Sequence, residues 1–256
     1  MISARRGDGL YARESITWRV ARENALLLGG GRALLMQLAH PLVARAVAEH
    51  SDFDHEPMRR LERTLALTLA MVFGSRDEAL AATRQINHVH AGVKGDGYTA
   101  MDPELLLWVH ATLVDSAIVT YRLFVGPLAD TDCDAYYRES WRTGRLLGIP
   151  QSLFPPDWPA FIAYLAEMID GSLRVGDVAR GLSTTVLHPR LGVPPVMLEP
   201  LAIVTAGLLP ESLREDYALA WGRRQRAAFA VATRTLPGLI RLLPDRIRLV
   251  PYAREA

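Results

Sequence analysis

Polar side chains that could take part in catalysis or ligand binding interrupt an otherwise apolar, helical stretch between residues 32 and 64. They are the imidazoles of His40 and His50 and the basic step Arg60-x-x-Arg63-Thr64. Burying imidazole, guanidinium or hydroxyl groups among Leu, Ala and Val costs free energy unless each is hydrogen-bonded, charge-paired or bound to a ligand. This stretch is therefore the first place to look for a functional site.

Helical spacing predicts that His90 points inward. It shares a face with Ala79 and Thr83, whereas His88 lines up with polar residues. An inward histidine beside small side chains has room for a flat ligand, as an axial haem histidine requires. A core histidine that only hydrogen-bonds to a neighbour explains the same pattern. His110, on the apolar stripe of a later helix with Leu113, is a rival for either role.

Arg60 and Thr64 also share a helix face with apolar residues, among them Met71. The helix is expected to begin at Pro57, since proline suits a first helical turn. A guanidinium and a hydroxyl then point toward core positions. The alternative is a surface ion pair between Arg60 and Glu56, which would contribute little.

Common templates for metal and nucleophile chemistry are absent from the sequence. There is no His-Glu-x-x-His, no Gly-x-Ser-x-Gly and no Gly-Lys-Ser/Thr phosphate loop. No glutamate is followed three residues later by histidine, which disfavours a carboxylate-bridged di-metal bundle. The single cysteine, Cys133, excludes an internal disulfide and four-cysteine metal sites and favours a reducing, cytoplasmic setting.

Composition predicts a globular protein. Half of the 256 residues are hydrophobic, enough for a substantial core, and no linker divides the chain, so we expect a single domain over residues 1–256. The 29 basic and 28 acidic residues leave a net charge of +1, which argues against a nucleic-acid partner. The apolar run 33–44 is too short for the roughly 20 residues of a transmembrane segment, and the N-terminus lacks the apolar region of a signal peptide.

Periodicity predicts an all-α fold with no run of alternating residues long enough for a sheet. Ser75 with Glu78 forms a capping box, and Asp102 before Pro103 is a second helix start. The expected helices cover residues 15–28, 57–73, 75–94, 103–124, 130–147, 158–169, 198–208 and 212–235.

The glycines and prolines between the helices predict how the chain turns there. The glycines at 29–31 let the chain turn or let a neighbouring helix approach closely. The step from His40 to Pro41 should kink or interrupt the second helix. Residues 181–200, which contain several prolines, are predicted to form a surface loop.

Six segments, in this order, resemble the catalytic domain shared by rubber oxygenases (latex clearing proteins) and the oxygenase of mycophenolic acid biosynthesis. They are 38–41 (LAHP), 49–53 (EHSDF), 60–64 (RLERT), 72–74 (VFG), 89–95 (VHAGVKG) and 102–110 (DPELLLWVH). The resemblance covers about residues 13–173 and is far more specific as an ordered set than any one motif.

The resemblance implies an all-helical fold with a loosely globin-like core around one b-type haem, held by a single proximal histidine. The family's ligand position, histidine followed by Val-x-Gly, maps to His90, and His110 then becomes a pocket or structural residue. The family's distal Arg-x-x-Lys-Thr segment maps to Arg60, Arg63 and Thr64.

Arg63 stands where the family has a lysine that can cap the iron. Because a guanidinium stays protonated, it cannot take that role. The distal position would hold water instead, or an imidazole such as His50 or His40.

The leading hypothesis is a haem b-dependent oxygenase or oxidase that acts with dioxygen on an apolar or aromatic small molecule. His90 would bind the iron, and Arg60 and Thr64 would stabilise negative charge developing on oxygen. A second hypothesis is a haem-binding sensor or carrier without turnover. A third is a helical small-molecule binding protein with structural histidines, which would purify without colour.

Overall fold

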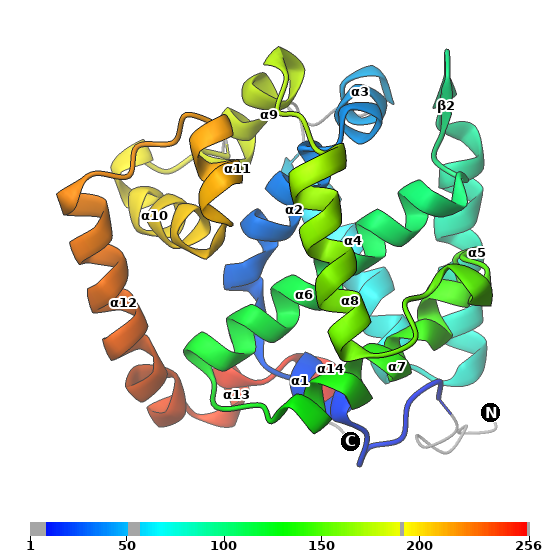
Figure 1. Cartoon of the computed structure of the whole chain (residues 1–256). Helices are drawn as coiled ribbons and strands as arrows, with labels where there is room; N and C mark the ends of the chain where they lie inside the picture. The colour runs from blue at the N-terminus through cyan, green and yellow to red at the C-terminus, as the bar shows by residue number, and fades with distance from the viewer. Residues whose placement is uncertain (1–8, 51–56, 190–191, 255–256) are drawn as a thin grey trace.

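The computed structural model describes residues 9–50, 57–189 and 192–254, except the side chains of residues 57–61 and 195. This part of the chain is mostly helical (Figure 1). Its elements are α1 (Ile16–Ala21), η1 (Asn24–Gly29), α2 (Gly30–Leu38), α3 (Pro41–His50), α4 (Pro57–Phe73), α5 (Arg76–Gly92), β1 (Lys94–Gly95), β2 (Tyr98–Thr99), α6 (Pro103–Phe124), α7 (Asp130–Leu146), η2 (Gln151–Leu153), α8 (Trp158–Glu167), η3 (Met168–Ser172), α9 (Asp177–Leu187), η4 (Pro195–Met197), α10 (Glu199–Leu208), α11 (Glu211–Asp216), α12 (Arg223–Leu242), α13 (Asp245–Arg248) and α14 (Pro251–Arg254). The predicted α class is confirmed.

Helices α2 and α6 form the centre of the molecule. They pack against each other, and α6 also contacts η1, α7 and α12. The main buried cluster draws on both helices and on α8, with Leu35, Trp108 and Phe161 almost fully buried. Helices α10 and α12 lie to one side of this centre, while α4 and α5 lie to the other (Figure 1).

The glycines at 29–31 permit close helix approach. Gly30 and Gly31 begin α2 instead of forming a turn. A methyl group on Gly29 would lie 2.2 Å from Thr120 Oγ1 of α6, and one on Gly31 would lie 2.4 Å from Thr205 Oγ1 of α10. Of the two expectations for these glycines, the close approach is therefore the one the structure shows.

The His40–Pro41 step interrupts the chain as predicted. Helix α2 ends at Leu38, α3 begins at Pro41, and residues 24–38 and 41–50 are bent by 105° relative to each other. Within the described residues, no single helix is long and apolar enough to cross a membrane, although this bent pair meets the length and composition test together.

Three predicted helix starts are confirmed. Helix α4 covers the predicted 57–73. At α5, the Ser75 amide donates to Glu78 Oε2 at 2.7 Å, and the Glu78 amide donates to Ser75 Oγ at 3.3 Å. At α6, Asp102 Oδ1 accepts from the Glu104 amide at 2.8 Å. These caps depend on residues three or fewer positions apart, which is why the sequence reveals them.

The predicted helix 15–28 is wrong in one respect, because the chain breaks at Arg22 and Glu23 and continues as the 3-10 helix η1. Glu23 is almost fully buried and accepts two hydrogen bonds from Arg248, at 2.8 and 2.9 Å. The extended backbone of Glu23 also bridges to Leu249. A contact 225 residues away in the sequence therefore overrides local helix propensity.

The predicted loop 181–200 is also wrong over its first part, since α9 continues to Leu187. Ala179, Ser183 and Leu187, four residues apart, are buried, and the helix packs against α2 and α3. The helix ends only before the His188–Pro189 step, where proline disfavours helical backbone at the preceding residue. Burial of one face outweighs the density of helix breakers nearby.

The predicted helix 212–235 is two helices, α11 and α12. The break includes Ala218, whose φ of 52° lies in the left-handed region, and follows Tyr217, whose hydroxyl donates to the Leu35 carbonyl at 2.7 Å. The small β1–β2 hairpin was not expected either, although its turn, Asp96-Gly97, is a common hairpin signal.

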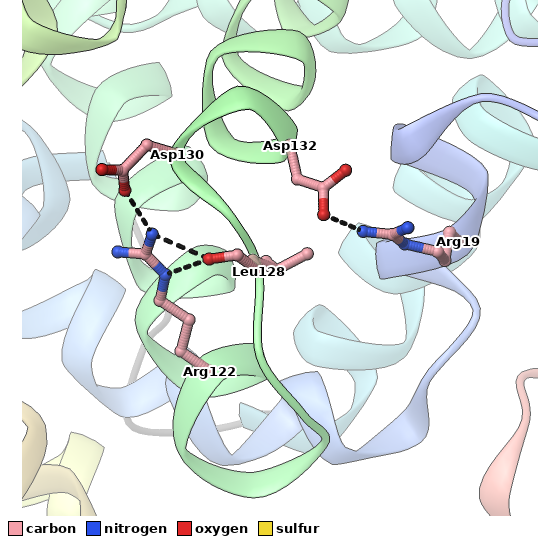
Figure 2. Close-up of polar contacts among 5 residues, drawn as sticks. All are labelled: Arg19, Arg122, Leu128, Asp130 and Asp132. Carbon is pink, nitrogen blue, oxygen red and sulfur yellow. Dashed lines mark hydrogen bonds and ion pairs between the residues drawn. The ribbon is translucent and has the colours of Figure 1, made fainter.

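The connection from α6 to α7 is held by arginines at the surface (Figure 2). Arg122 donates to the Leu128 carbonyl at 2.9 and 3.2 Å and to Asp130 at 2.8 Å. Arg19 of α1 pairs with Asp132 of α7 at 2.6 Å. These contacts orient the start of α7 against α1 and α6.

Candidate functional site

The inward orientation of His90 on α5 is confirmed. Ala79 and Thr83, on the same face, are buried, and His90 is half-buried. His88 is exposed. The amphipathic pattern of α5 thus determines which of its two histidines can serve an internal site.

One ring nitrogen of His90 has no hydrogen-bond partner in the part of the chain that the structure describes. This atom, Nδ1, is buried. Burial also lowers the pKa of the ring, which keeps the imidazole neutral near pH 7. A neutral imidazole with an uncommitted nitrogen is the form that coordinates a metal.

Asn87, one turn before His90, is a residue that the sequence analysis missed. Its Nδ2 donates to the Leu146 carbonyl at the end of α7, at 3.0 Å, and so ties α5 to α7. Its Oδ1 is buried without a partner in the described structure. The signal was present, because Asn87 is three residues from His90 and shares its face.

The connection from α5 to α6, residues 93–102, joins His90 to α3. The Val93 amide donates to the His90 carbonyl at 3.0 Å, and the Ala100 amide donates to the Val93 carbonyl at 2.9 Å. His50, at the end of α3, contacts the Lys94 carbonyl through Nε2 at 3.0 Å. The exposed ring of His50 is therefore occupied by the hairpin.

Tyr98 and Glu49 strengthen the same junction. The Tyr98 hydroxyl donates to Glu49, and Arg45 pairs with Glu49 at 2.8 Å while lying over the Tyr98 ring. These contacts lower the pKa of Glu49, with the hydrogen bond from Tyr98 as the largest cause. Helix α3 is thus held along the hairpin that follows His90.

His40, at the α2–α3 break, has the same property as His90. Its Nδ1 is buried and lacks a hydrogen-bond partner within the described ranges. Burial lowers the pKa of His40, and the carboxylate of Asp102 at the start of α6 opposes that shift. His40 and His50 therefore both lie beside the connection that leaves His90.

Helix α4 brings the predicted arginine–threonine segment to the same end of the molecule. Helices α4 and α5 pack together and are joined by only Gly74 and Ser75, so they run in opposite directions from that turn. Arg60, early in α4, and His90, late in α5, both lie at the end away from the turn.

The prediction that Thr64 points toward the core on the same face as Met71 is wrong, because Thr64 is exposed while Met71 is buried. Arg63 is exposed as well. The side chain of Arg60 and the proposed pair with Glu56 lie outside the described residues. Thr64 and Arg63 therefore face solvent in this structure.

His110, the alternative candidate for the inward ligand, already has a hydrogen-bond partner. Its Nε2 lies 3.0 Å from Ser140 Oγ of α7, and its ring meets Phe154 edge-on. Burial lowers its pKa to about 4, so the ring is neutral. Leu113 is 53% exposed and does not belong to the buried stripe that contains His110. The surroundings of His110 are therefore those of a histidine with a structural role.

Within the described ranges, no three His, Cys, Asp or Glu side chains gather to hold a metal ion. A haem iron is held mainly by its porphyrin and needs only one or two side chains from the protein.

Two cavities, of about 530 Å³ and 320 Å³, are not lined by His90 or His40. The first lies beside Arg142 and Arg145 and the second beside His188 and Arg224.

Comparison with known proteins places the chain in a family. Residues 18–238 match the family described as "ER-bound oxygenase mpaB/B'/Rubber oxygenase, catalytic domain". The chain belongs to this family, and the resemblance seen in the sequence is confirmed. The family assigns it to the oxidoreductases of the oxygenase type.

Two mycobacterial proteins are similar over most of their length. Uncharacterized protein Mb2261 of Mycobacterium bovis and uncharacterized protein Rv2237 of Mycobacterium tuberculosis are each 27% identical over 234 residues, covering 86% of this chain and 90% of the relative. No solved structure matches the chain at a significant level.

The histidines of this chain fit the haem that the family implies. His90 and His40 each offer a buried imidazole nitrogen with no partner in the described structure, in a ring that burial keeps neutral. Buried polar atoms without partners call for an explanation, and a bound ligand or ion is one, although this structure also has such atoms elsewhere, among them Trp108 Nε1 and Trp141 Nε1.

Proposed function

We propose that this protein is a haem b-dependent oxygenase that acts with dioxygen on an apolar or aromatic small molecule, with His90 as the iron ligand. The observation that carries the proposal is the buried Nδ1 of His90, which has no hydrogen-bond partner among the described residues. It occurs in a ring that burial keeps neutral, at the position to which the sequence resemblance maps the family's ligand. A structural histidine in this chain, His110, has its partner instead.

The haem would supply the iron that activates dioxygen. The chain's own contribution begins with His90, whose carbonyl is held by the Val93 amide at the end of α5. That contact, and the tie from Asn87 to α7, orient the end of the helix that carries the ring. A ligand on a helix fixed at two points keeps its direction, as axial ligands require.

Arg60 and Thr64 are proposed to act on the opposite, distal side. A guanidinium cation and a hydroxyl would stabilise negative charge that develops on oxygen during the reaction. The position of Arg60 in the first turn of α4, at the end of the α4–α5 pair that also carries His90, supports this assignment, and Thr64 follows one turn further along α4. Arg63, the neighbouring cation, stays protonated and would border the pocket without capping the iron.

The apolar substrate is proposed from the family resemblance. The buried apolar residues of the α4–α5 pair, Met71, Phe73, Ala79 and Ala82, lie at the end that contains the Gly74–Ser75 turn, not at the end that carries His90. Apolar walls at the reacting centre would admit a hydrophobic molecule and limit water. The buried cluster that joins Ile16 to Tyr217 supports the single-domain expectation, and no described residue of α4 or α5 belongs to it.

The proposal is tested by absorption spectra of protein produced with haem supplied. We expect a Soret band in the wild type and in His88→Ala, which changes an exposed residue of the same helix, and loss of the band in His90→Ala. Equal haem retention in both variants would contradict the assignment of His90. A colourless wild-type protein would contradict haem binding altogether.

A haem-binding sensor or carrier is a second candidate, and His40 is the observation that favours it. A second neutral imidazole with an unpartnered buried nitrogen could occupy the distal position and leave no open site for dioxygen. The ferric protein would then be low-spin at pH 7, and His40→Ala would convert it to a high-spin form. The oxygenase proposal expects a high-spin wild type that binds imidazole or cyanide readily.

A further inference from the structure

The C-terminal helices carry a feature that the proposed site does not use. Helix α12 lies at the outer edge of the molecule, with α10 on its inner side (Figure 1). Its inner face packs into a buried cluster of α6 and α10 through four residues, Phe229, Ala232, Leu236 and Ile240. The helix is therefore fixed in place, and its outer face is what it presents to solvent.

The outer face contains large apolar side chains in exposed positions. Leu242 is 82% exposed, and Val231, Leu239, Leu243 and Ile247 of α13 are each exposed as well. Single exposed apolar residues are ordinary, but four of these five, Leu239, Leu242, Leu243 and Ile247, fall within nine residues at the end of α12 and in α13, which is not ordinary. Such a group indicates a surface that another apolar medium covers.

Arginines accompany these apolar residues. Residues 223–254 contain eight arginines and a single acidic residue, Asp245, for a net charge of +7, whereas the whole chain has +1. The rest of the chain is therefore acidic. Arg248 forms an ion pair with the buried Glu23. Arg234 and Arg241 form no ion pair with any described residue.

Helical geometry places the two kinds of residue side by side. At about 100° per residue, Arg223, Arg234 and Arg241 lie within about 20° of one another on the outer face of α12. Val231 and Leu242 follow at about 80° and 100° around the helix from them, and Leu239, at about 160°, borders the packed face that contains Ala232. The outer face thus has a basic stripe bordered by an apolar one.

We propose that this face, formed by α12 and α13, binds the surface of an anionic lipid membrane. A basic stripe beside exposed leucines is the pattern of helices that lie in the plane of a membrane, with arginines at the headgroups and apolar residues inserted between them. Charge complementarity favours lipid over a second copy of the chain, because two such faces would bring arginine against arginine. The proposal does not depend on haem.

Binding to vesicles tests the proposal with the whole protein. In a sedimentation assay, we expect at least about tenfold stronger binding to phosphatidylcholine vesicles containing about one-third phosphatidylglycerol than to phosphatidylcholine alone, and weaker binding at high salt. Equal binding to both vesicles, or none to either, would overturn the proposal.

Matched variants locate the surface. Leu242→Glu and the double change Arg234→Glu with Arg241→Glu should each lower binding to anionic vesicles about fivefold or more. Val178→Glu, at a residue of α9 that is 50% exposed, should leave it unchanged. Equal binding by Leu242→Glu and wild type would show that this face is not the lipid contact. A wild-type dimer that Leu242→Glu dissociates, seen by sedimentation velocity, would assign the face to a second copy and overturn the proposal.

Discussion

Buried histidines and ion pairs differ between two regions of the molecule, although Trp108 Nε1 and Thr120 Oγ1 of α6 also lack a hydrogen-bond partner among the described residues. Around α6, Arg32 of α2 pairs with Asp115 at 2.6 Å and donates to Ser116 Oγ and the Leu208 carbonyl, each at 2.8 Å. His110, further along the same helix, has its contact with Ser140. Each of these groups has the counter-group that burial demands.

The region at the end of α5 lacks this completeness. The Nδ1 atoms of His90 and His40 and the Oδ1 of Asn87 are buried without partners in the described structure. Desolvation is costly when no hydrogen bond replaces water, so evolution retains such groups where something else uses them. The contrast teaches that satisfaction of buried polar atoms, more than burial itself, separates structural histidines from candidate ligands.

The largest expected effect is in the satisfied region. Asp115→Leu leaves the Arg32 guanidinium buried without its counter-charge and should lower the free energy of unfolding by about 3–5 kcal/mol. Denaturation in urea measures it. The double variant Arg32→Met with Asp115→Leu removes both charges and should recover most of the loss. A single variant as stable as wild type would show that this ion pair is not needed for stability.

Acid sensitivity sharpens the comparison next. The folded protein keeps His110 neutral with a pKa of about 4, whereas an unfolded histidine has a pKa near 6.5. The unfolded state therefore binds more protons between these values, and stability falls as pH drops from about 6.5 to about 4. The contribution of His110 is roughly 3 kcal/mol, since each pKa unit corresponds to about 1.4 kcal/mol.

His110→Asn removes the titrating group while keeping an amide that can reach Ser140. We expect the difference in unfolding free energy between pH 7.5 and pH 4.5 to shrink by roughly 2–3 kcal/mol in this variant. His88→Asn, at an exposed position, is the control and should keep the wild-type pH dependence. An unchanged difference in His110→Asn would contradict the lowered pKa.

The smallest expected effect concerns His90. In haem-free protein, His90→Leu loses no hydrogen bond at Nδ1 and gains apolar contact, so the free energy of unfolding should change by less than about 1 kcal/mol or rise slightly. The same change at His110 breaks the contact with Ser140 and should cost about 1–3 kcal/mol. Equal losses in both variants, measured in urea, would remove the distinction between the two histidines.

Local signals in the sequence predicted much of the helical framework and the orientation of His90 in the candidate site. The starts of α4, α5 and α6 and the break at Pro41 were confirmed, and so was the inward face of His90. The roles of Arg60, Arg63, Thr64, His50 and His40 remain predictions from the family resemblance. The loop predicted at 181–200 failed because burial of α9 against α2 and α3 is not a local property.

Caps, prolines and helical periodicity act over a few residues, through steric limits on the backbone and hydrogen bonds within one turn. For that reason the sequence by itself determined where most helices begin and which face of α5 is apolar. Only the tertiary structure decided that Glu23 leaves its helix for Arg248, 225 residues away, and that His110 finds Ser140, 30 residues away, while His90 finds no partner among the described residues. Whether a buried polar atom is satisfied depends on what the fold brings beside it, and helical spacing carries no information about that neighbour.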